Sequence, residues 1–406
     1  MMRSMYAGVS GLKVHQTRMD VIGNNIANVN TIGFKASRVT FKDILSQTVK
    51  GASAPQNNRG GTNPMEVGLG VGLGSIDVNH TPGNLQTTNI QTDLAIDGNG
   101  FFIYNDGSRD FYSRAGALTI DDDGNLVNTL NGYKIQGWQA DTNGVIDINT
   151  PITSINIPRG QVLQAAASTE LDISGNINPD QSTFTVSADL VDSQGKPQTV
   201  VIELNKTAPN NWDWEAQWED NTGTVNVVGS GSISFDGAGD LTTGMPIASA
   251  ISFNPTGVDP MNLELDFTGL TQAYGASSFD VSKNGYPMGS FESITINGSG
   301  TVVGTYSNGR TKPLAQIALA TFDNPAGLSK AGDSMFAVTT NSGDPDRGIA
   351  GSGGRGEIAP GNLEMSNVDL AEQFTDMITT QRGFQANSKI IQTADQMLQD
   401  LVNIKR

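Results

Sequence analysis

The side chains that most often carry catalysis are scarce in this sequence. It contains two histidines, His15 and His80, and no cysteine. A catalytic histidine acts on a nearby nucleophile and is oriented by a third group. No Ser/His/Asp, Cys/His or zinc-binding constellation stands out around either residue. We therefore interpret both histidines as surface or interface residues, and we expect the protein not to be an enzyme.

Two clusters resemble ligand-binding loops but have the wrong spacing. Residues 121–125 read DDDGN, whereas a calcium-binding EF-hand loop places its glycine later and ends on a glutamate. Residues 68–74 read GLGVGLG and lack the Gly-Lys-Ser/Thr ending of a phosphate-binding loop. We interpret the first cluster as a hairpin turn and the second as strand-edge glycines. The sequence therefore predicts neither a metal site nor a cofactor.

A row of aromatic residues is the remaining candidate for ligand binding. Trp212, Trp214 and Trp218 share one face of a strand if that strand is regular. Such a row could stack on sugar rings, or it could form the core of a domain with few other large side chains. We favour the core, because large aromatic side chains usually supply core burial.

The bulk composition excludes several classes of partner. The 406 residues carry a net charge of -17, which argues against nucleic acid and anionic membranes. Apolar runs are too short to cross a bilayer, so we expect no membrane insertion. The N-terminus lacks the apolar core of a cleavable secretory signal. The 48 glycines follow no collagen period and indicate many tight turns.

The two ends of the chain are predicted to be helices that need partners. Ser366 and Asp369 fit a capping box at the start of the C-terminal helix, residues 366–406. Apolar residues in that helix recur every seven positions, as in a coiled coil. Glycine lowers the stability of an isolated helix, and both helices contain it: Gly383 in the C-terminal helix, and Gly8, Gly11 and Gly23 in the N-terminal helix. The apolar positions are Met5, Val9, Leu12, Met19, Ile22 and Ile26 near the N-terminus, and Leu370, Phe374, Met377, Ile378, Phe384, Ile391, Leu398 and Leu401 near the C-terminus. We expect the two ends to pack against each other and against other copies of the chain.

Between the helices the sequence predicts short strands. Residues 35–47 are interpreted as a short helix, and the polar, Gly/Pro-rich residues 51–64 as a mobile loop. After residue 68, frequent Asp-Gly and Asn-Gly pairs predict β-hairpins. The pattern PGNLxxxN occurs at both 82–89 and 360–367, which favours a nested plan with outgoing and returning arms side by side.

The predicted fold class is mainly β with long terminal α-helices, in which discontinuous β domains are nested inside a helical coiled-coil domain. The predicted division has four parts. These are a helical domain of residues 1–30 and 366–406, a connecting helix and mobile loop of residues 31–67, a discontinuous β domain of residues 68–159 and 281–365, and an inserted outer β domain of residues 160–280.

Several motifs resemble one known family. Residues 20–35 read DVIGNNIANVNTIGFK, which closely resembles the N-terminal signature of the bacterial flagellar axial proteins of rod and hook. Residues 97–102, 111–116, 300–308 and 314–322 resemble the β segments of that family, and residues 366–382 resemble its C-terminal helix. The resemblance covers both ends and the outer β segments, and the motif residues that it marks are Asn24, Asn25, Asn28, Gly33, Phe34 and Lys35.

This resemblance implies a structural role. It implies a subunit that polymerises into the hook, a flexible helical tube that joins rod and filament, with the terminal helices as its inner coiled-coil layer. The implied partners are other copies of the chain, the hook cap, the distal rod, the hook–filament junction proteins and the type III export apparatus. The implied location is the flagellum, at the basal body and hook outside the cell, reached without a cleaved signal peptide.

Two alternatives remain open at this point. The first, within the same family, is a subunit of the distal rod, although the length of the chain and its central insert favour the hook. The second is a secreted glycan-binding β protein that uses the tryptophan row. That alternative gives no reason for coiled-coil-like helices at both ends of the chain.

Overall fold

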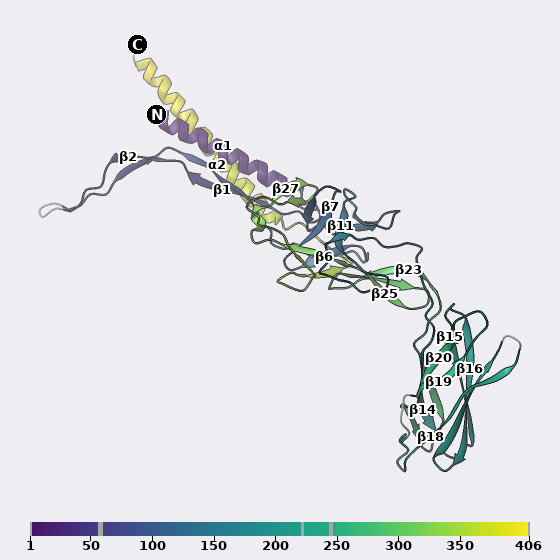
Figure 1. Ribbon diagram of the computed structural model, residues 1–406. Helices are drawn as coiled ribbons and strands as arrows, with labels where there is room; N and C mark the ends of the chain where they lie inside the picture. The colour runs from purple at the N-terminus through teal and green to yellow at the C-terminus, as the bar shows by residue number, and fades with distance from the viewer. Residues whose placement is uncertain (1, 56–59, 221–222, 243–246, 405–406) are drawn as a thin grey trace. The chain divides into compact units, whose positions relative to one another are not determined.

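The chain forms two compact units in a computed structural model that describes residues 2–55, 60–220, 223–242 and 247–404. The helix-bearing unit consists of Met1–Pro158, Ile294–Val303 and Pro313–Arg406. The inserted unit consists of Arg159–Ser293 and Gly304–Lys312. The fold is mainly β with one long helix near each end (Figure 1), so the predicted fold class is confirmed.

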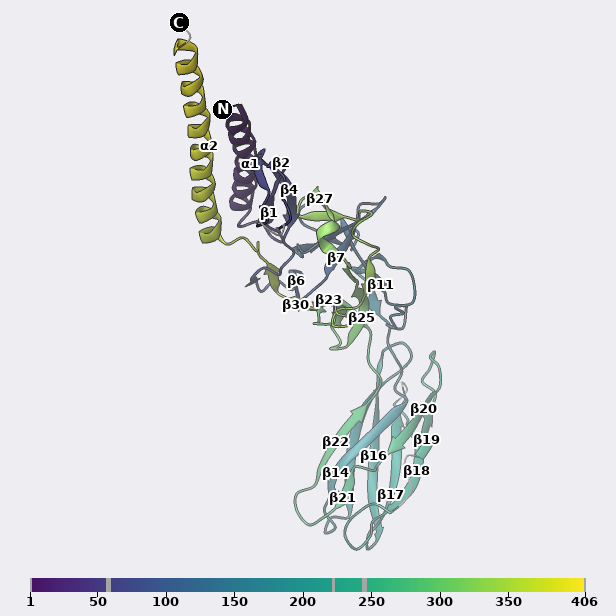
Figure 2. The ribbon, with the colours of Figure 1, turned by 90° about the vertical axis from the view of Figure 1, so that its left-hand side faces the viewer.

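Two helices, α1 (Met2–Ala27) and α2 (Leu370–Ile404), bring the ends of the chain together. They lie side by side in the helix-bearing unit (Figure 2). The helix α2 begins later than predicted, because Asp369 is the residue whose carboxylate caps it. Its Oδ1 accepts hydrogen bonds from the backbone N–H groups of Ala371 at 2.8 Å and Glu372 at 3.3 Å. Ser366 lies outside the helix.

The predicted short helix at residues 35–47 is wrong. This segment forms β1 (Ser37–Asp43) and the start of β2 (Ser46–Lys50). The strand β1 pairs antiparallel with β4 (Val71–Val78), and β2 pairs antiparallel with β3 (Met65–Gly68). Apolar and polar residues alternate from residue 38 to 42, and Val39 and Thr40 are β-branched, so strand periodicity prevails here.

The segment predicted to be a mobile loop continues this second hairpin. Ser53 and Thr62 form an isolated β-bridge near its tip, and residues 56–59 lie outside the described part of the chain. Among the glycines of residues 68–74, Gly68 ends β3, Gly72 and Gly74 lie in β4, and Gly70 lies between the two strands, which confirms that they are strand and strand-edge glycines.

The β core of the helix-bearing unit is built from outgoing and returning halves of the chain. In its main sheet β11 lies between β25 and β7, and β8 lies between β7 and β28. The strands before the insert are β5 (Leu85–Thr87), β6 (Leu94–Asp97), β7 (Phe101–Asn105), β8 (Asp110–Ser113), β9 (Leu118–Ile120), β10 (Leu126–Asn128), β11 (Lys134–Gln139) and β12 (Thr153–Ser154). The strands after it are β23 (Gly289–Ile296), β24 (Thr301–Tyr306), β25 (Thr311–Ile317), β26 (Leu319–Thr321), β27 (Ser329–Gly332), β28 (Met335–Ala337), β29 (Asp346–Gly348), β30 (Glu357–Pro360) and β31 (Asn362–Glu364), with a short 3-10 helix at Pro325–Gly327.

The echo between the two PGNL segments has a structural counterpart. The strands β5 and β31, which lie within the two PGNL segments, pair antiparallel with Leu363 opposite Gln86. Next to them β30 pairs with β6. The nested plan is therefore confirmed, because the outgoing and returning arms hydrogen-bond to each other where the chain enters and leaves the β core.

The inserted unit is a sandwich of two sheets. One sheet has the order β15-β16-β17-β18, and the other has the order β19-β20-β14-β21 with β22 also paired to β14. Its strands are β14 (Glu170–Ile177), β15 (Thr183–Val191), β16 (Pro197–Ala208), β17 (Asn211–Glu219), β18 (Val225–Ser234), β19 (Ile247–Phe253), β20 (Met261–Asp266), β21 (Leu270–Gln272) and β22 (Ser278–Lys283). The short strand β13 (Val162–Leu163) is in neither sheet and pairs with β23. Inward-facing apolar residues of both sheets form one core.

The tryptophan row belongs to this core. Trp212, Trp214 and Trp218 are all buried on β17. The Nε1 group of Trp212 donates a hydrogen bond to Gln272 Oε1 of the opposite sheet at 3.1 Å. The interpretation of the row as core is confirmed, and none of the three rings is available to stack on a sugar.

The acidic cluster of residues 121–125 forms the turn between β9 and β10. Asp121 Oδ1 accepts a hydrogen bond from the backbone N–H of Asn125 at 2.6 Å, as predicted for a hairpin turn. Within the described residues, no group of three His, Asp or Glu side chains could hold a metal ion. No helix in that part of the chain is long and apolar enough to cross a membrane.

Candidate functional site

Glycines of both helices lie in the contact between α1 and α2. A Cβ atom built on Gly383 of α2 would lie 2.6 Å from the imidazole ring of His15 on α1. A Cβ on Gly11 would lie 2.8 Å from the amide of Asn387, and one on Gly8 would lie 3.2 Å from Ile391. These glycines form notches for side chains of the partner helix, so their lack of a side chain allows the helices to approach closely.

Polar pairs fix the register of this antiparallel contact. Arg18 donates to Asp376 Oδ2 at 2.8 Å. The buried Asn25 donates from Nδ2 to Gln373 Oε1 at 3.0 Å and to the carbonyl of Ser37 at 2.8 Å. One side chain therefore ties the end of α1 both to α2 and to the start of β1.

The apolar positions predicted on α1 are mostly left uncovered. Only Ile22 is fully buried, while Met5, Leu12, Met19 and Ile26 are half-buried and Val9 is 49% exposed. Met2 and Tyr6, which the sequence analysis did not include, are 56% and 62% exposed. They follow the spacing of the stripe toward the N-terminus, so the periodicity could have identified them.

The predicted stripe on α2 is more exposed still. Phe374 and Ile378 are 51% and 53% exposed, and Leu370 and Phe384 are also exposed. Met377, Ile391 and Leu398 are half-buried, and the side chain of Leu401 lies outside the described residues. Aromatic and aliphatic side chains exposed in a row along a helix are typical of a surface that another protein covers.

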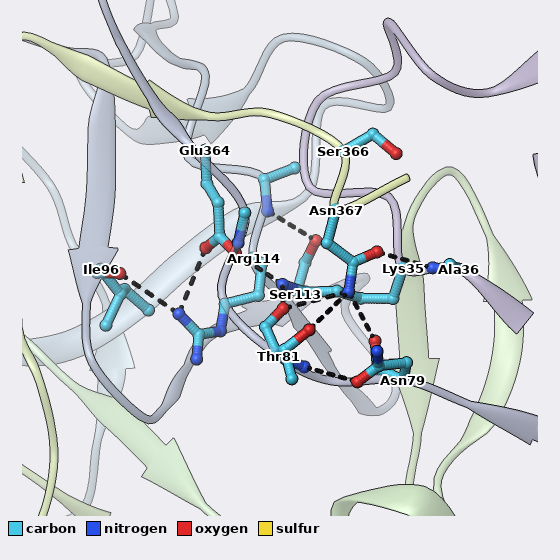
Figure 3. Close-up of polar contacts among 12 residues, drawn as sticks. Lys35, Ala36, Asn79, Thr81, Ile96, Ser113, Arg114, Glu364, Ser366 and Asn367 are labelled. Atoms are coloured by element: carbon cyan, nitrogen blue, oxygen red, sulfur yellow. Dashed lines mark hydrogen bonds and ion pairs between the residues drawn. The ribbon is translucent and has the colours of Figure 1, made fainter. Parts of the chain in front are cut away.

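A buried cluster of ionised side chains joins the segment that follows α1 and the segment that precedes α2 to the β core (Figure 3). We call these two segments the helix roots. Lys35, which follows α1, donates from Nζ to Glu364 Oε1 at 2.6 Å, and Arg114 donates to Glu364 Oε2 at 3.2 Å. The side chains of Lys35 and Glu364 are fully buried, and that of Arg114 is 3% exposed. Burial lowers the pKa of Lys35 and of Arg114, and Glu364 opposes this effect at both residues.

Asn367 completes this junction, just before α2. Its Oδ1 accepts from the backbone N–H of Ala36 at 2.8 Å, and its Nδ2 donates to the carbonyls of Asn79 at 2.9 Å and Thr81 at 3.1 Å (Figure 3). The carbonyl of Thr81 also accepts from Lys35 at 2.6 Å. The segment 79–81 therefore holds the chain leaving α1 and the chain entering α2 together.

The remaining family-motif residues have separate positions around the junction. Gly33 has a positive φ of 66°, and a Cβ there would lie 2.6 Å from the backbone nitrogen of Ala115, so only glycine fits. Asn28 donates from Nδ2 to the carbonyl of Asn24 at 2.9 Å. Phe34 packs under the Lys330 ammonium, 4.9 Å from its ring centroid. Asn24, Asn28 and Phe34 line a groove of about 440 Å³ beside β27 and β28.

Both histidines are half-buried in the helix-bearing unit, where each packs against other side chains. His15 packs against Gly383 and stands edge-on to Phe41, with ring centroids 5.5 Å apart. Burial lowers its pKa, and Arg18 lowers it further. His80 lies between Phe101 and Phe336. His15 is thus an interface residue, as expected, but the interface is the helix contact within one chain. His80 belongs to the β core.

Models of known protein families match four parts of the chain. Residues 5–35 match "Flagella basal body rod protein", and residues 95–189 match "Flagellar hook protein FlgE/F/G D1 domain". Residues 162–286 match "Flagellar basal body protein FlaE D2 domain", and residues 359–404 match "Flagellar basal body rod FlgEFG protein C-terminal". The matches include both helices and both β units.

Whole-chain comparisons agree with these models. The chain is 44% identical to the flagellar hook protein FlgE of Borreliella burgdorferi and 33% identical to the flagellar basal-body rod protein FlgG of Bacillus subtilis, with 100% of each chain covered in both alignments. It shares the fold of the Helicobacter pylori flagellar hook protein FlgE2, at a TM-score of 0.53 and 15% identity, with 69% of this chain and 100% of that chain covered. Because the hook relative is similar from end to end, the chain belongs to the flagellar hook protein family.

Proposed function

We propose that the chain is a structural subunit of the bacterial flagellar hook, which polymerises with its own copies into a helical tube. The observation that carries this proposal is the exposure of Phe374 and Ile378 on α2, because the contact with α1 leaves about half of each side chain uncovered. The apolar stripes are then the contact between copies. A stripe that meets a different surface of the next copy builds an open helix when the rotation between copies does not close a ring.

The proposed contact surface consists of the apolar positions predicted on both helices. These are Met5, Val9, Leu12, Met19, Ile22, Ile26, Leu370, Phe374, Met377, Ile378, Phe384, Ile391, Leu398 and Leu401. The terminal helices would form the inner layer of the tube, and the inserted unit, taken as residues 160–280, would form its outer layer. The tube would act as a flexible joint without catalysing a reaction.

The finer aspects of partners and location belong to the same proposal. The subunit would pass through the type III export apparatus without a cleaved signal peptide and would assemble outside the cell. It would contact the distal rod at one end of the tube, a hook cap during growth and the hook–filament junction proteins at the other end. The full-length similarity to a hook protein supports these partners as a class.

The test compares the full chain with a chain that lacks residues 1–30 and 366–406. Sedimentation and negative-stain electron microscopy measure assembly, and circular dichroism reports whether the shortened chain retains its β structure. We expect tubes from the full chain and a folded β-rich monomer from the shortened chain. Tubes from both chains would contradict the proposed role of the helices, and a full chain that never assembles, even on hook fragments, would contradict the function.

The similarity to a rod protein supports a subunit of the distal rod as the second candidate. The identity is lower than to the hook relative, 33% against 44%. Electron microscopy of the same tubes separates the two candidates, because rods are straight whereas a hook subunit should form curved tubes.

A further inference from the structure

The histidine of the β core is placed where a proton would be poorly tolerated. The ring centroid of His80 lies 5.7 Å from that of Phe101 and 5.0 Å from that of Phe336. Its Nδ1 and Nε2 atoms are both buried and have no hydrogen-bond partner among the described residues. A neutral imidazole is tolerated here better than a protonated ring, which would add a positive charge and a second N–H donor without an acceptor.

The charges around His80 are predominantly positive. The cations that act on it are Lys35 after α1, Arg114 after β8 and Lys330 on β27. The carboxylate of this cluster is Glu364 on β31, and it already bonds both Lys35 and Arg114. A proton on His80 would therefore add a fourth positive charge to a group that holds one negative charge.

The neighbours of His80 in the chain are the residues that hold the helix roots. The carbonyl of Thr81 accepts hydrogen bonds from Lys35 Nζ and Asn367 Nδ2, and the carbonyl of Asn79 accepts another from Asn367. A displacement of His80 therefore acts directly on the bonds that fasten the chain leaving α1 and the chain entering α2. This arrangement links the charge of one ring to the attachment of the helix pair.

We propose that protonation of His80 at acid pH opens this junction between the two helices and the β core. When the ring gains a proton, it leaves its place between Phe101 and Phe336, and the segment 79–81 separates from Lys35 and Asn367. Both helix roots are then loosened from the β core while the inserted unit is unaffected. The opening belongs to the single subunit and does not depend on polymerisation.

The direction of the pH dependence follows from the environment of the ring. Burial lowers the pKa of His80 to about 4, and Lys35, Arg114 and Lys330 contribute to the shift. A free histidine has a pKa of about 6.5. The neutral ring therefore stabilises the closed junction fully above about pH 6.5, and this stabilisation is lost as the pH falls toward about 4.

The first test is a proton NMR titration of the unassembled full chain. Because the chain has only two histidines, the variant His15→Asn leaves His80 as the single source of the imidazole Cε1–H signal. We expect that signal to titrate near pH 4. A midpoint near the ordinary value of about 6.5 would overturn the proposal, whatever the fate of any His80 variant.

The second test measures hydrogen exchange of residues 28–36 and 365–369 at pH 7.5 and pH 4.5. After correction for intrinsic rates, we expect acid to raise exchange there by about tenfold or more in the native chain. The variant His80→Phe, which keeps an aromatic ring in the site, should abolish most of this rise. Amides of the inserted unit are the internal reference. An equal acid response in His80→Phe and the native chain would contradict the proposal.

Discussion

Single residues decide how the helices are attached, and the most consequential one is a buried carboxylate. Glu364 neutralises two cations that come from distant parts of the chain, Lys35 and Arg114. The sequence analysis marked Lys35 only through its family resemblance and did not identify Glu364. Their sequence separation explains this, because no local pattern links residue 364 to residues 35 and 114 before the fold is known.

Removing this charge should be costly. The variant Glu364→Gln leaves Lys35 and Arg114 buried without their anion, so we expect the free energy of unfolding to fall by about 3–5 kcal/mol. Denaturant titration followed by circular dichroism measures the loss. The control is Arg38→Gln, whose guanidinium pairs with Asp77 at 3.7 Å but is 75% exposed, and which should cost less than about 1 kcal/mol. Equal losses in the two variants would contradict the role of the cluster.

Gly33 allows a second prediction at the residue scale. The variant Gly33→Ala adds both the strain of a positive φ and a clash with the backbone of Ala115. The matched control is Gly132→Ala, where φ is 73° and nothing lies within 4 Å of the added Cβ. We expect Gly132→Ala to cost about 1 kcal/mol and Gly33→Ala to cost clearly more in thermal unfolding. If the two glycines tolerate alanine equally, the predicted clash between a Cβ at residue 33 and the backbone of Ala115 is contradicted.

At the scale of elements, the sequence predicted the two terminal helices from their periodicity but not the face through which they meet. Glycines such as Gly8, Gly11 and Gly383 were interpreted as weak points, because glycine disfavours an isolated helix. In the structure these glycines lie in the contact between α1 and α2. Their missing side chains make room for the partner helix, an effect that an isolated helix does not show. The short helix expected at residues 35–47 was wrong for a related reason. Its strand character depends on pairing with β4, which lies some thirty residues later.

Changing the exposed stripe should abolish assembly without unfolding the subunit. In the double variant Phe374→Ser and Ile378→Ser, we expect the contact with α1 to be retained because both side chains are exposed. We expect the variant to keep the circular dichroism spectrum and melting temperature of the native chain but to stay monomeric in sedimentation.

The control is Thr375→Ala, which changes a neighbouring exposed residue on another side of α2. It should assemble as the native chain does. If the double variant still forms tubes at native concentrations, the stripe is not the contact between copies.

At the scale of the whole molecule, the sequence predicted that one β unit is inserted into another. The repeated PGNLxxxN pattern at residues 82–89 and 360–367 marks where the chain enters and leaves the β core. The tryptophans could also be assigned to a core, because their spacing puts them on one face of a strand and large aromatic side chains usually supply core burial. The bounds of the two units could not, since the returning hairpin contributes Gly304–Lys312 to the inserted unit. Local sequence carries no signal for which unit a hairpin tip joins.

The inserted unit should control bending rather than assembly. Deleting residues 160–280 removes most of the proposed outer layer but leaves both helices and their stripes in place. We expect tubes to form, with a curvature and bending stiffness different from those of native tubes in electron micrographs. Unchanged curvature and stiffness would refute a mechanical role for the inserted unit, whereas a loss of all tubes would show that this unit is needed for assembly.

The central claim is that polymerisation covers the apolar face of α2, and thiol reactivity tests it most directly. The chain has no cysteine, so Phe374→Cys places a single thiol on the stripe and Thr375→Cys places one beside it. Each variant is mixed as a small fraction into native subunits, and its reaction rate with a water-soluble maleimide is measured before and after assembly. We predict that assembly slows the reaction at residue 374 by at least about tenfold, as expected for a side chain that becomes buried in an interface core, and slows it much less at residue 375. A thiol at residue 374 that reacts equally fast in tubes and in free subunits would contradict the account.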